Sequence, residues 1–422
     1  MDHPAFFDSF ELLLPDFSKI DGSKWSVVAC DQFTSEPAYW KAVEKTVGSA
    51  PSTLSLVLPE VYLSERANRI PKIHSAMEEA QKSLLHPIPD AMIALERTQS
   101  DGRVRRGIVG LIDLETYEFK KGAASLIRAT EGTVEERIRP RVEIRRNAPL
   151  ELPHVLLLVD DPKKTVIEPA VSSASKREAL YDFPLMLGGG HVKGWLLTKE
   201  EQKKIQRALA LLADPVHQKE LYGDGIAAPL LFAVGDGNHS LATAKTVYEE
   251  IKAGIGAEAA KKHPARYALC EIENLHDDAL SFEPIYRVVF DCDPEALLTE
   301  FSDYANALDG NAAPQTLTAL QKGKATELVI SHPVHHLTVG TLQTFLDVYC
   351  KHHPDASVDY IHGEESLRSL AAKENAIGFL FDGMKKEELF QSVIFDGALP
   401  KKTFSMGQAH DKRYYLECRK IK

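Results

Sequence analysis

Residues 228–253 read Ala-Pro-Leu-Leu-Phe-Ala-Val-Gly-Asp-Gly-Asn-His-Ser-Leu-Ala-Thr-Ala-Lys-Thr-Val-Tyr-Glu-Glu-Ile-Lys-Ala. The apolar run from Ala228 to Val234 is typical of a buried central strand. After this run and a polar loop, apolar side chains recur at helical spacing and share one face: Leu241, Ala244, Tyr248 and Ile251. The pattern predicts a strand that feeds an amphipathic helix in an α/β protein.

The loop between strand and helix carries side chains suited to chemistry. Gly235 and Gly237 let the backbone turn sharply and approach a ligand closely. We expect Asn238 or Ser240 to cap the helix, whose first-turn N–H groups then favour anions. His239 could donate to phosphate or act as an acid or base near neutral pH. The loop therefore predicts a cofactor site made of Gly235, Asp236, Gly237, Asn238, His239 and Ser240.

A purely structural interpretation of the loop stays open. A tight turn uses glycine for its geometry, Asp236 and Asn238 for side-chain bonds to the backbone, and Ser240 for the cap. It leaves His239 without a role. In the functional interpretation His239 is catalytic and Asp236 binds a metal ion or accepts a proton.

Composition excludes some classes of protein. The chain has 422 residues, 44% of them hydrophobic, and a net charge of -11. It is long enough for roughly two or three domains. The acidic balance argues against nucleic acid as a partner. No apolar run is long enough for a membrane span, and no signal peptide is visible, so we expect a cytoplasmic protein. The odd number of cysteines, five, fits reduced thiols.

The rest of the chain predicts a mixed α/β (α+β) fold. Short strands are expected at residues 11–14, 25–30, 91–96, 103–113, 156–159, 267–272, 285–290, 327–330, 376–381 and 414–418. Helices are expected near residues 37, 64–85, 198–212, 294–307, 339–351 and 364–373. Thr198 with Glu201 forms a capping-box pattern. The best candidate break is at 309–314, which predicts a main domain at 1–308 and a C-terminal α/β portion at 309–422.

Charged residues elsewhere extend the candidate site. Asp31 and Glu36 follow an N-terminal strand, and either could be a catalytic base or a magnesium ligand; Glu36 could equally be a helix-start acid. Arg128, Glu131 and Thr133 could clamp a ligand or form a polar loop. Arg287 could pair with a buried acid or reach the site. An arginine-rich stretch could bind anions or form a solvated helical face: Arg128, Arg137, Arg139, Arg141, Arg145 and Arg146.

Several motifs carry a family resemblance. The element Asp-Gly-Asn-His-Ser at 236–240 resembles the Asp-Gly-x-His-Arg element of the bacterial family called domain of unknown function 1015. Further segments resemble that family's other motifs: residues 25–40, 128–133, 282–289, 400–407 and 411–415. Three positions depart from the pattern, since Ser240 stands in the place of Arg, and Thr130 and Tyr286 stand in the place of His.

The resemblance has implications for fold and activity. The family's loop is similar to that of ParB/sulfiredoxin-like proteins, which include nucleotide-binding partition proteins and free-serine kinases. It implies a ParB/sulfiredoxin-like core with a mixed sheet, and a loop that contacts the phosphates of ATP or ADP with Mg²⁺. The implied function is a phosphotransferase acting on a small hydroxylated metabolite. A nucleotide-binding switch and a non-catalytic small-molecule binder stay open, and a homodimer is compatible with the sequence.

Overall fold

The computed structural model describes residues 6–120, 122–133 and 135–422, and it is a mixed α/β structure. The chain forms two compact units. Unit 1 comprises Met1–Leu280 together with Gly407–Lys422, and unit 2 comprises Ser281–Met406. The mixed α/β class expected from the sequence is confirmed.

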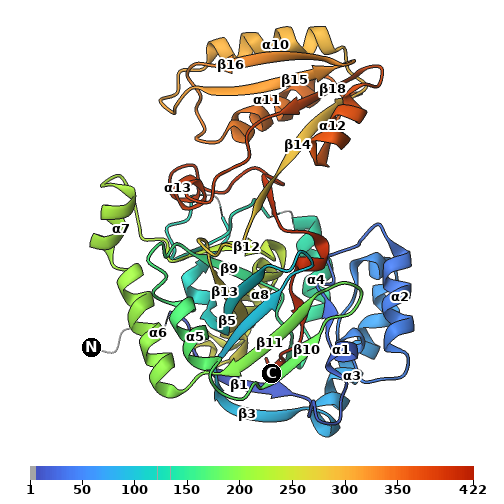
Figure 1. Ribbon diagram of the computed structural model, residues 1–422, viewed down its shortest axis with the longest axis vertical. Coiled ribbons are helices and arrows are strands. Elements are labelled where there is room, and N and C mark those ends of the chain that lie inside the picture. The colour runs from blue at the N-terminus through green and yellow to red at the C-terminus, as the bar shows by residue number, and fades with distance from the viewer. Residues whose placement is uncertain (1–5, 121, 134) are drawn as a thin grey trace. The chain divides into compact units, whose positions relative to one another are not determined.

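Unit 1 is built on a mixed sheet (Figure 1). Among the described residues it has nine strands in the order β10-β11-β4-β5-β13-β9-β12-β7-β6. Their bounds, in that order, are Tyr181–Pro184, His191–Leu196, Ile93–Thr98, Val104–Asp113, Tyr267–Asn274, Leu156–Val159, Phe232–Asp236, Ile127–Arg128 and Tyr117–Glu118. The pairs β13–β9, β12–β7 and β7–β6 are parallel, and the other pairs are antiparallel.

The sheet separates two hydrophobic cores because side chains alternate along its strands. Ile108 and Ala268 belong to one core, whereas their neighbours Val109 and Leu269 belong to the other. The first core is closed by apolar side chains of helices α5 (Ile167–Ala174), α6 (Lys199–Leu212) and α8 (Asn238–Ile255). The start of α8 is thereby held against a rigid layer.

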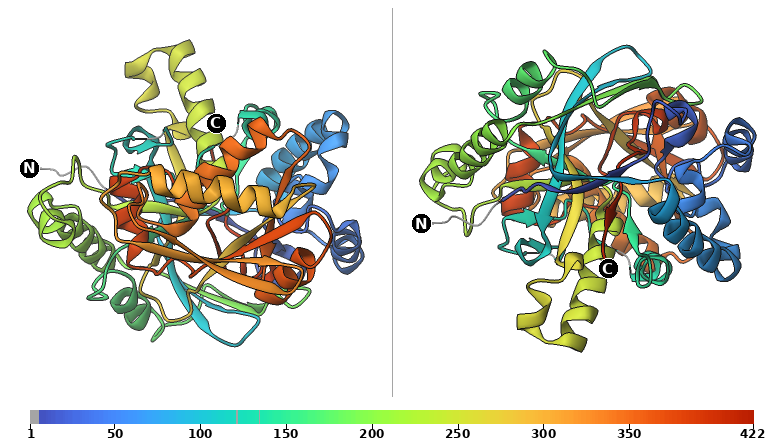
Figure 2. Two further views of the ribbon diagram at one scale, coloured as in Figure 1. Left: turned by 90° about the horizontal axis from the view of Figure 1, so that it is seen from above. Right: turned by 90° about the horizontal axis from the view of Figure 1, so that it is seen from below.

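The second core is covered by the N-terminal elements and the end of the chain. These elements are β1 (Phe10–Leu14), α1 (Gly22–Trp25), β2 (Val27–Val28), α2 (Pro37–Val47), α3 (Arg66–Ser83), β3 (His86–Ala91), β8 (Leu150–Glu151), β20 (Tyr414–Tyr415) and β21 (Arg419–Lys420). The C-terminal segment forms part of this layer, since β2 pairs with β20 and β8 pairs with β21. Two views show α2 and α3 on the opposite side of unit 1 from α6 and α7 (Pro215–Tyr222) (Figures 1 and 2).

Short elements complete unit 1. They are η1 (Thr53–Leu56), η2 (Glu60–Glu65), η3 (Leu114–Thr116), α4 (Glu135–Arg145), α9 (Ala257–Ala260), η4 (Pro264–Arg266) and η5 (Ala409–Asp411).

Unit 2 has its own sheet, in the order β16-β15-β18-β14-β17, with β19 paired to the start of β14. Its elements are β14 (Phe282–Phe290), α10 (Pro294–Ala307), β15 (Gln315–Gln321), β16 (Lys324–Ile330), α11 (Thr338–His352), β17 (Ser357–His362), α12 (Glu364–Ala371), β18 (Ala376–Leu380), α13 (Glu388–Phe395) and β19 (Phe404–Met406). The boundary expected at 308 and 309 falls inside this unit, after α10, because β14 pairs with β17 and β18.

Most expected elements are present, and the differences have local causes. The capping box of Thr198 and Glu201 is confirmed. The strand expected at 25–30 is reduced to Val27–Val28, because helix α1 occupies the preceding residues. The strand expected at 414–418 is shortened to β20, and a separate strand, β21, follows it and pairs with a different partner. Within the described part of the chain, no helix combines the length and the hydropathy needed to cross a membrane.

Candidate functional site

The polar loop lies where β12 passes into α8, as the sequence predicts, but its details differ. The helix begins at Asn238, so Asn238, His239 and Ser240 form its first turn. The N-cap residue is Gly237, with φ of +84°, and it has no side chain to cap the helix. The expectation that Asn238 or Ser240 caps the helix is therefore wrong. A Cβ atom at Gly237 would lie 3.1 Å from Val155 Cα, so this position needs glycine for both conformation and space.

Asn238 locks the loop to the segment that follows β7. Its side chain is buried, and its Oδ1 accepts a hydrogen bond from Thr130 N–H at 3.1 Å. Its Nδ2 donates to Thr130 Oγ1 at 3.1 Å, and that hydroxyl in turn donates to the Val234 carbonyl at 2.6 Å. Asn238 and Thr130 thus hold the first turn of α8 against the end of β12.

His239 is partly buried beside positive charge. Burial is the main reason that its pKa falls to about 4, and the charges of Arg141 and Arg137 lower it further, while Asp31 opposes them. The imidazole is therefore neutral near pH 7 in this state. It can donate or accept a hydrogen bond there without carrying a charge.

Ser240 begins a chain of polar contacts that the sequence pattern does not reveal. Its Oγ lies 2.9 Å from His154 Nε2, and His154 Nδ1 lies 2.8 Å from the Tyr415 hydroxyl. The Tyr415 hydroxyl donates to Cys30 Sγ at 3.0 Å. His154 and Tyr415 are separated by 261 positions. Tyr415 ends the segment 411–415 that carries part of the family resemblance, but no sequence pattern connects it to His154 or Ser240, so only the tertiary structure reveals this contact.

Asp31 approaches this chain from the N-terminal layer. Its Oδ2 lies 3.8 Å from His154 Nε2, and its side chain is partly exposed. Burial acts to raise the pKa of this carboxyl, but His154, a hydrogen bond from Gln32 and the charges of Arg141 and Lys412 lower it below its usual value. Asp31 is thus an ionised carboxylate near the start of α8. This state suits a general base or a metal ligand.

Glu36 lies at the start of α2, where it is exposed and its side chain makes no capping hydrogen bond. A different acid joins the site. Glu60 forms an ion pair with Arg141, and burial raises the pKa of its carboxyl while Arg141 opposes the rise. The sequence pattern around Glu60 contains no signal for this role.

Asp236 is the predicted metal-binding residue. Its Oδ2 is buried without a hydrogen bond in the described structure, and Lys412 Nζ lies 3.5 Å from it as an ion-pair partner. Among the described residues, no three His, Cys, Asp or Glu side chains gather as a ready-made metal site. Mg²⁺ commonly uses one or two carboxylates together with phosphate oxygens, so a single carboxylate such as Asp236 fits that type of site.

The other predicted site residues are placed as follows. Arg128 is buried and donates from Nε to the Ser125 carbonyl at 2.8 Å and from Nη2 to those of Ala228 and Pro229 at 2.9 and 3.1 Å. These bonds hold the segment that precedes β12 in place. Glu131 is partly buried, and Thr133 lines a separate groove between α4 and α8.

Arg287 belongs to unit 2, where it is buried. Its Nε donates to Gln343 Oε1 at 3.0 Å, and its other donors reach the carbonyls of Ile285, Lys401 and Lys402. Its contacts with these carbonyls and with Gln343 support the fold of unit 2.

From Arg137 to Arg145 the arginine-rich stretch lies in helix α4, and Arg146 follows directly; most of these arginines form ion pairs. These are Arg139 with Glu135, Arg141 with Glu60, Arg145 with Glu151, and Arg146 with Glu250. Arg137 is exposed, and its charge reaches both Glu60 and His239. The stretch thus supplies two guanidinium groups, those of Arg137 and Arg141, to the neighbourhood of the loop.

A cavity of about 150 Å³ opens beside the first turn of α8. Polar side chains in its wall are those of Ser240, His154, Tyr415 and Cys30, together with the charged residues Glu60, Arg141, Arg145 and Glu151. Most of the remaining wall is apolar, including Leu58, Leu63, Met77, Leu150, Val155 and Ala244. The cavity can therefore accept a small apolar group next to a hydroxyl and an imidazole.

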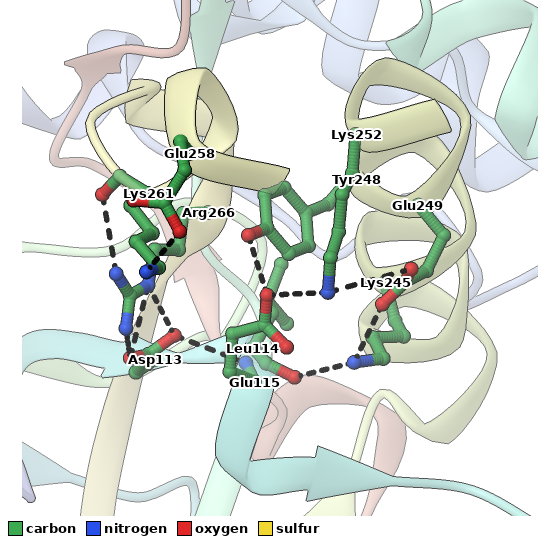
Figure 3. Close-up of polar contacts among 10 residues, drawn as sticks. All are labelled: Asp113, Leu114, Glu115, Lys245, Tyr248, Glu249, Lys252, Glu258, Lys261 and Arg266. Atoms are coloured by element: carbon green, nitrogen blue, oxygen red, sulfur yellow. Dashed lines mark hydrogen bonds and ion pairs between the residues drawn. The ribbon is translucent and has the colours of Figure 1, made fainter. Parts of the chain in front are cut away.

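The body of α8 is fixed by polar contacts farther along the helix (Figure 3). Tyr248 and Lys252 both bind Glu115 Oε1 at 2.7 Å, and Lys245 donates to the Leu114 carbonyl at 2.9 Å. These contacts tie the helix to η3. They leave its N-terminal turn as a rigidly held end facing the polar groups described above.

The comparisons with known proteins identify a family. The family model described as a protein of unknown function (DUF1015) matches residues 15–349. No curated protein matches the sequence.

Three solved structures show distant likeness. A conserved hypothetical protein from Pyrococcus furiosus has 10% identity and a TM-score of 0.35, with 74% of this chain and 94% of that chain covered. A mutant free serine kinase in complex with ADP has 12% identity and a TM-score of 0.36, with 74% and 91% covered. SbnI with a C-terminal truncation from Staphylococcus aureus has 10% identity and a TM-score of 0.34, with 71% and 82% covered. These likenesses are too distant to assign an activity. The family model, by contrast, spans most of the chain, and the protein belongs to the DUF1015 family.

Proposed function

We propose that this protein is a nucleotide-dependent phosphotransferase that acts on a small hydroxylated metabolite. The observation that carries the proposal is the start of α8. Its N-cap is a glycine without a capping side chain, and an ionised Asp31 and a neutral His239 lie beside it. A helix start of this kind offers N–H groups and a partial positive charge to phosphate oxygens.

The surrounding residues can bind phosphate, accept the proton of the acceptor hydroxyl and hold a metal ion, which are separate requirements of phosphoryl transfer. Lys412, Arg137 and Arg141 supply positive charge for phosphates, and neutral His239 can donate a hydrogen bond to them. Asp31 is the candidate base for the acceptor hydroxyl. Asp236 would hold Mg²⁺ together with phosphate oxygens, since its buried Oδ2 has no hydrogen bond in the described structure. When bound, Mg²⁺ supplies neutralisation of the charge on the transferred group.

Phosphoryl transfer needs mainly positioning and charge stabilisation. A rigid helix end fulfils the first need, because Asn238 and Thr130 lock it in place. The mixed set of cationic and anionic side chains fulfils the second. A nucleotide-bound switch would use the same phosphate contacts and would lack the transfer step.

The experiment first measures thermal stabilisation by ATP, ADP and AMP, each with and without Mg²⁺. Nucleotides that stabilise the protein are then tested for transfer to serine, other small alcohols and sugars by phosphorus NMR. We expect His239→Ala and Asp31→Asn to remove transfer while the fold is retained. His352→Ala, a change at an exposed histidine of unit 2, is the matched control.

Each outcome decides between the candidate functions. Stabilisation without transfer to any acceptor supports the switch and rejects the transferase. No stabilisation by any nucleotide rejects both and leaves a non-catalytic small-molecule binder. Full activity in His239→Ala would show that the site assignment is wrong.

A further inference from the structure

Ser240 and His154 form a hydroxyl–imidazole pair that the proposed phosphoryl transfer does not use. Ser240 Oγ lies 2.9 Å from His154 Nε2, which is within the range for a nucleophile and its general base. Both side chains line the cavity of about 150 Å³. His154 is itself buried, so its ring position is determined by packing and by its polar partners.

Tyr415 can set the tautomer of His154. The tyrosine hydroxyl lies 3.0 Å from Cys30 Sγ and 2.8 Å from His154 Nδ1. When this hydroxyl donates to Cys30, it accepts from Nδ1, and Nε2 is left to accept the Ser240 hydroxyl proton. That tautomer is the one that a general base for serine requires.

The same helix end can stabilise an oxyanion. Leu241 N–H donates to the Gly237 carbonyl at 2.9 Å and so makes the first hydrogen bond of α8. The N–H groups of Asn238 and Ser240 precede it and belong to the first turn, where amides lack a partner within the helix. Preorganised backbone donors of this kind stabilise the charge of a tetrahedral intermediate.

Asp31 places a carboxylate near the same nitrogen of the imidazole that Ser240 approaches. Its Oδ2 lies 3.8 Å from Nε2, which is too far for a hydrogen bond but close enough to stabilise an imidazolium. The pair thus combines a hydroxyl, an imidazole within hydrogen-bond distance of it, the amides of a helix first turn and a nearby carboxylate.

The cavity indicates the class of substrate. A cavity of about 150 Å³ has room for a group of roughly the size of benzene. Its apolar wall includes Leu58, Met77 and Val155. An acyl group with a short apolar chain or a single ring matches this volume and polarity.

We propose that Ser240 and His154 catalyse the hydrolysis of esters of small apolar carboxylic acids. Ser240 Oγ attacks the carbonyl carbon, a new C–O bond forms, and the serine proton passes to His154 Nε2. The bond to the leaving oxygen then breaks, and that oxygen takes the proton from Nε2, which releases the alcohol and leaves an acyl-serine.

Water completes the cycle. It gives a proton to Nε2 as its oxygen attacks the acyl carbon, the bond to Ser240 breaks, and the proton returns to Oγ. The products are one alcohol and one carboxylic acid, and no oxidant, reductant or nucleotide takes part. This activity therefore stands or falls independently of the proposed phosphoryl transfer.

The test uses the full-length protein without nucleotide. A fluorophosphonate probe is expected to label the wild type on Ser240, identified by mass spectrometry, and to leave Ser240→Ala unlabelled. Ser175→Ala, a change at an exposed serine, is the matched control and should be labelled like the wild type. Hydrolysis of p-nitrophenyl acetate, butyrate and benzoate gives the rates.

Two further variants test the roles of the base and the cavity. His154→Gln should lower kcat at least ~100-fold, as expected for the loss of a general base. Ala244→Leu partly fills the cavity, so it should raise KM for the benzoate ester more than for the acetate ester. Tryptophan fluorescence establishes that each variant is folded.

Labelling and hydrolysis together decide whether Ser240 is a nucleophile. Labelling that is equal in the wild type and in folded Ser240→Ala overturns the proposal, and so does ester hydrolysis that persists unchanged in His154→Gln. Absence of both labelling and hydrolysis in the wild type overturns it as well, whatever the nucleotide experiments show.

Discussion

Asn238→Ala tests whether the first turn of α8 is held by its contacts with Thr130. The substitution removes the bond that Oδ1 accepts from Thr130 N–H and the bond that Nδ2 donates to Thr130 Oγ1, both 3.1 Å long. Asn238 and Thr130 are buried, so water does not readily replace the lost partner.

The magnitude follows from those two bonds. Each neutral hydrogen bond contributes about 0.5–1.5 kcal/mol, which gives about 1–3 kcal/mol for the pair. The Thr130 N–H group is left buried without its acceptor, and such a group costs about 1–3 kcal/mol. Because the two contributions overlap, we expect the free energy of unfolding of unit 1 to fall by about 2–4 kcal/mol.

Urea unfolding followed by tryptophan fluorescence measures this quantity. All three tryptophans of the chain, Trp25, Trp40 and Trp195, are buried in unit 1, so their signal reports on that unit alone. Asn147→Ala, at an exposed position, is the control and should change stability by less than about 0.5 kcal/mol.

A double-mutant cycle with Thr130→Val isolates the contact itself. Residues that share a hydrogen-bond network show coupling of about 0.5–3 kcal/mol. A loss below about 1 kcal/mol in Asn238→Ala, together with additive effects in the double variant, would refute the idea that this pair holds the helix end.

Three other substitutions test separate parts of the structure. Gly237→Ala should destabilise unit 1 by at least about 1–2 kcal/mol in urea, because φ is +84° and Cβ would lie 3.1 Å from Val155. The control is Gly254→Ala in α8, where a Cβ meets open space, and this change should be neutral or stabilising. Equal effects of the two changes would contradict a need for glycine at 237. The folded pKa of His239, about 4, lies below the ordinary 6.5, so between these pH values the unfolded chain binds more protons and stability falls as pH decreases. His239→Gln should weaken that dependence in unfolding measured from pH 7.5 down to ~4.5, and an unchanged profile would rule out the low pKa. Arg287→Met should destabilise unit 2 by about 2–4 kcal/mol, since it leaves the buried Ile285 carbonyl and the buried Gln343 side-chain oxygen without this donor. Hydrogen exchange across residues 281–406 measures it, and wild-type protection there would refute a structural role.

Local pattern was sufficient for much of the secondary structure. The amphipathic repeat after residue 240 places α8, and the capping box at Thr198 and Glu201 places the start of α6. The strands expected at 91–96 and 103–113 correspond to β4 and β5, and a turn with Gly102 at φ of +85° joins them. These features depend on residues within a few positions of one another, so side-chain spacing and turn chemistry encode them directly.

The composition of the candidate site was only partly predictable. The structure places Asp31, Arg137 and Arg141 near His239 of the loop, and the role of these residues in a site stays a prediction. Glu60, His154 and Tyr415 were missed, because no spacing rule connects them to the loop. The helix cap was assigned to Asn238 or Ser240, although the left-handed conformation at Gly237 places the cap one residue before Asn238.

The sequence by itself determined the family, the α/β character and the strand–loop–helix that carries the glycine-flanked turn. Only the tertiary structure determines which side chains lie beside that turn. Ser240 and His154 are 86 positions apart, and His154 and Tyr415 are 261 positions apart. Such contacts depend on the order of strands in the sheet and on the return of the C-terminal segment to unit 1. Neither leaves a periodic signal in the residues, because each strand pattern records which face is buried but not which strand lies beside it.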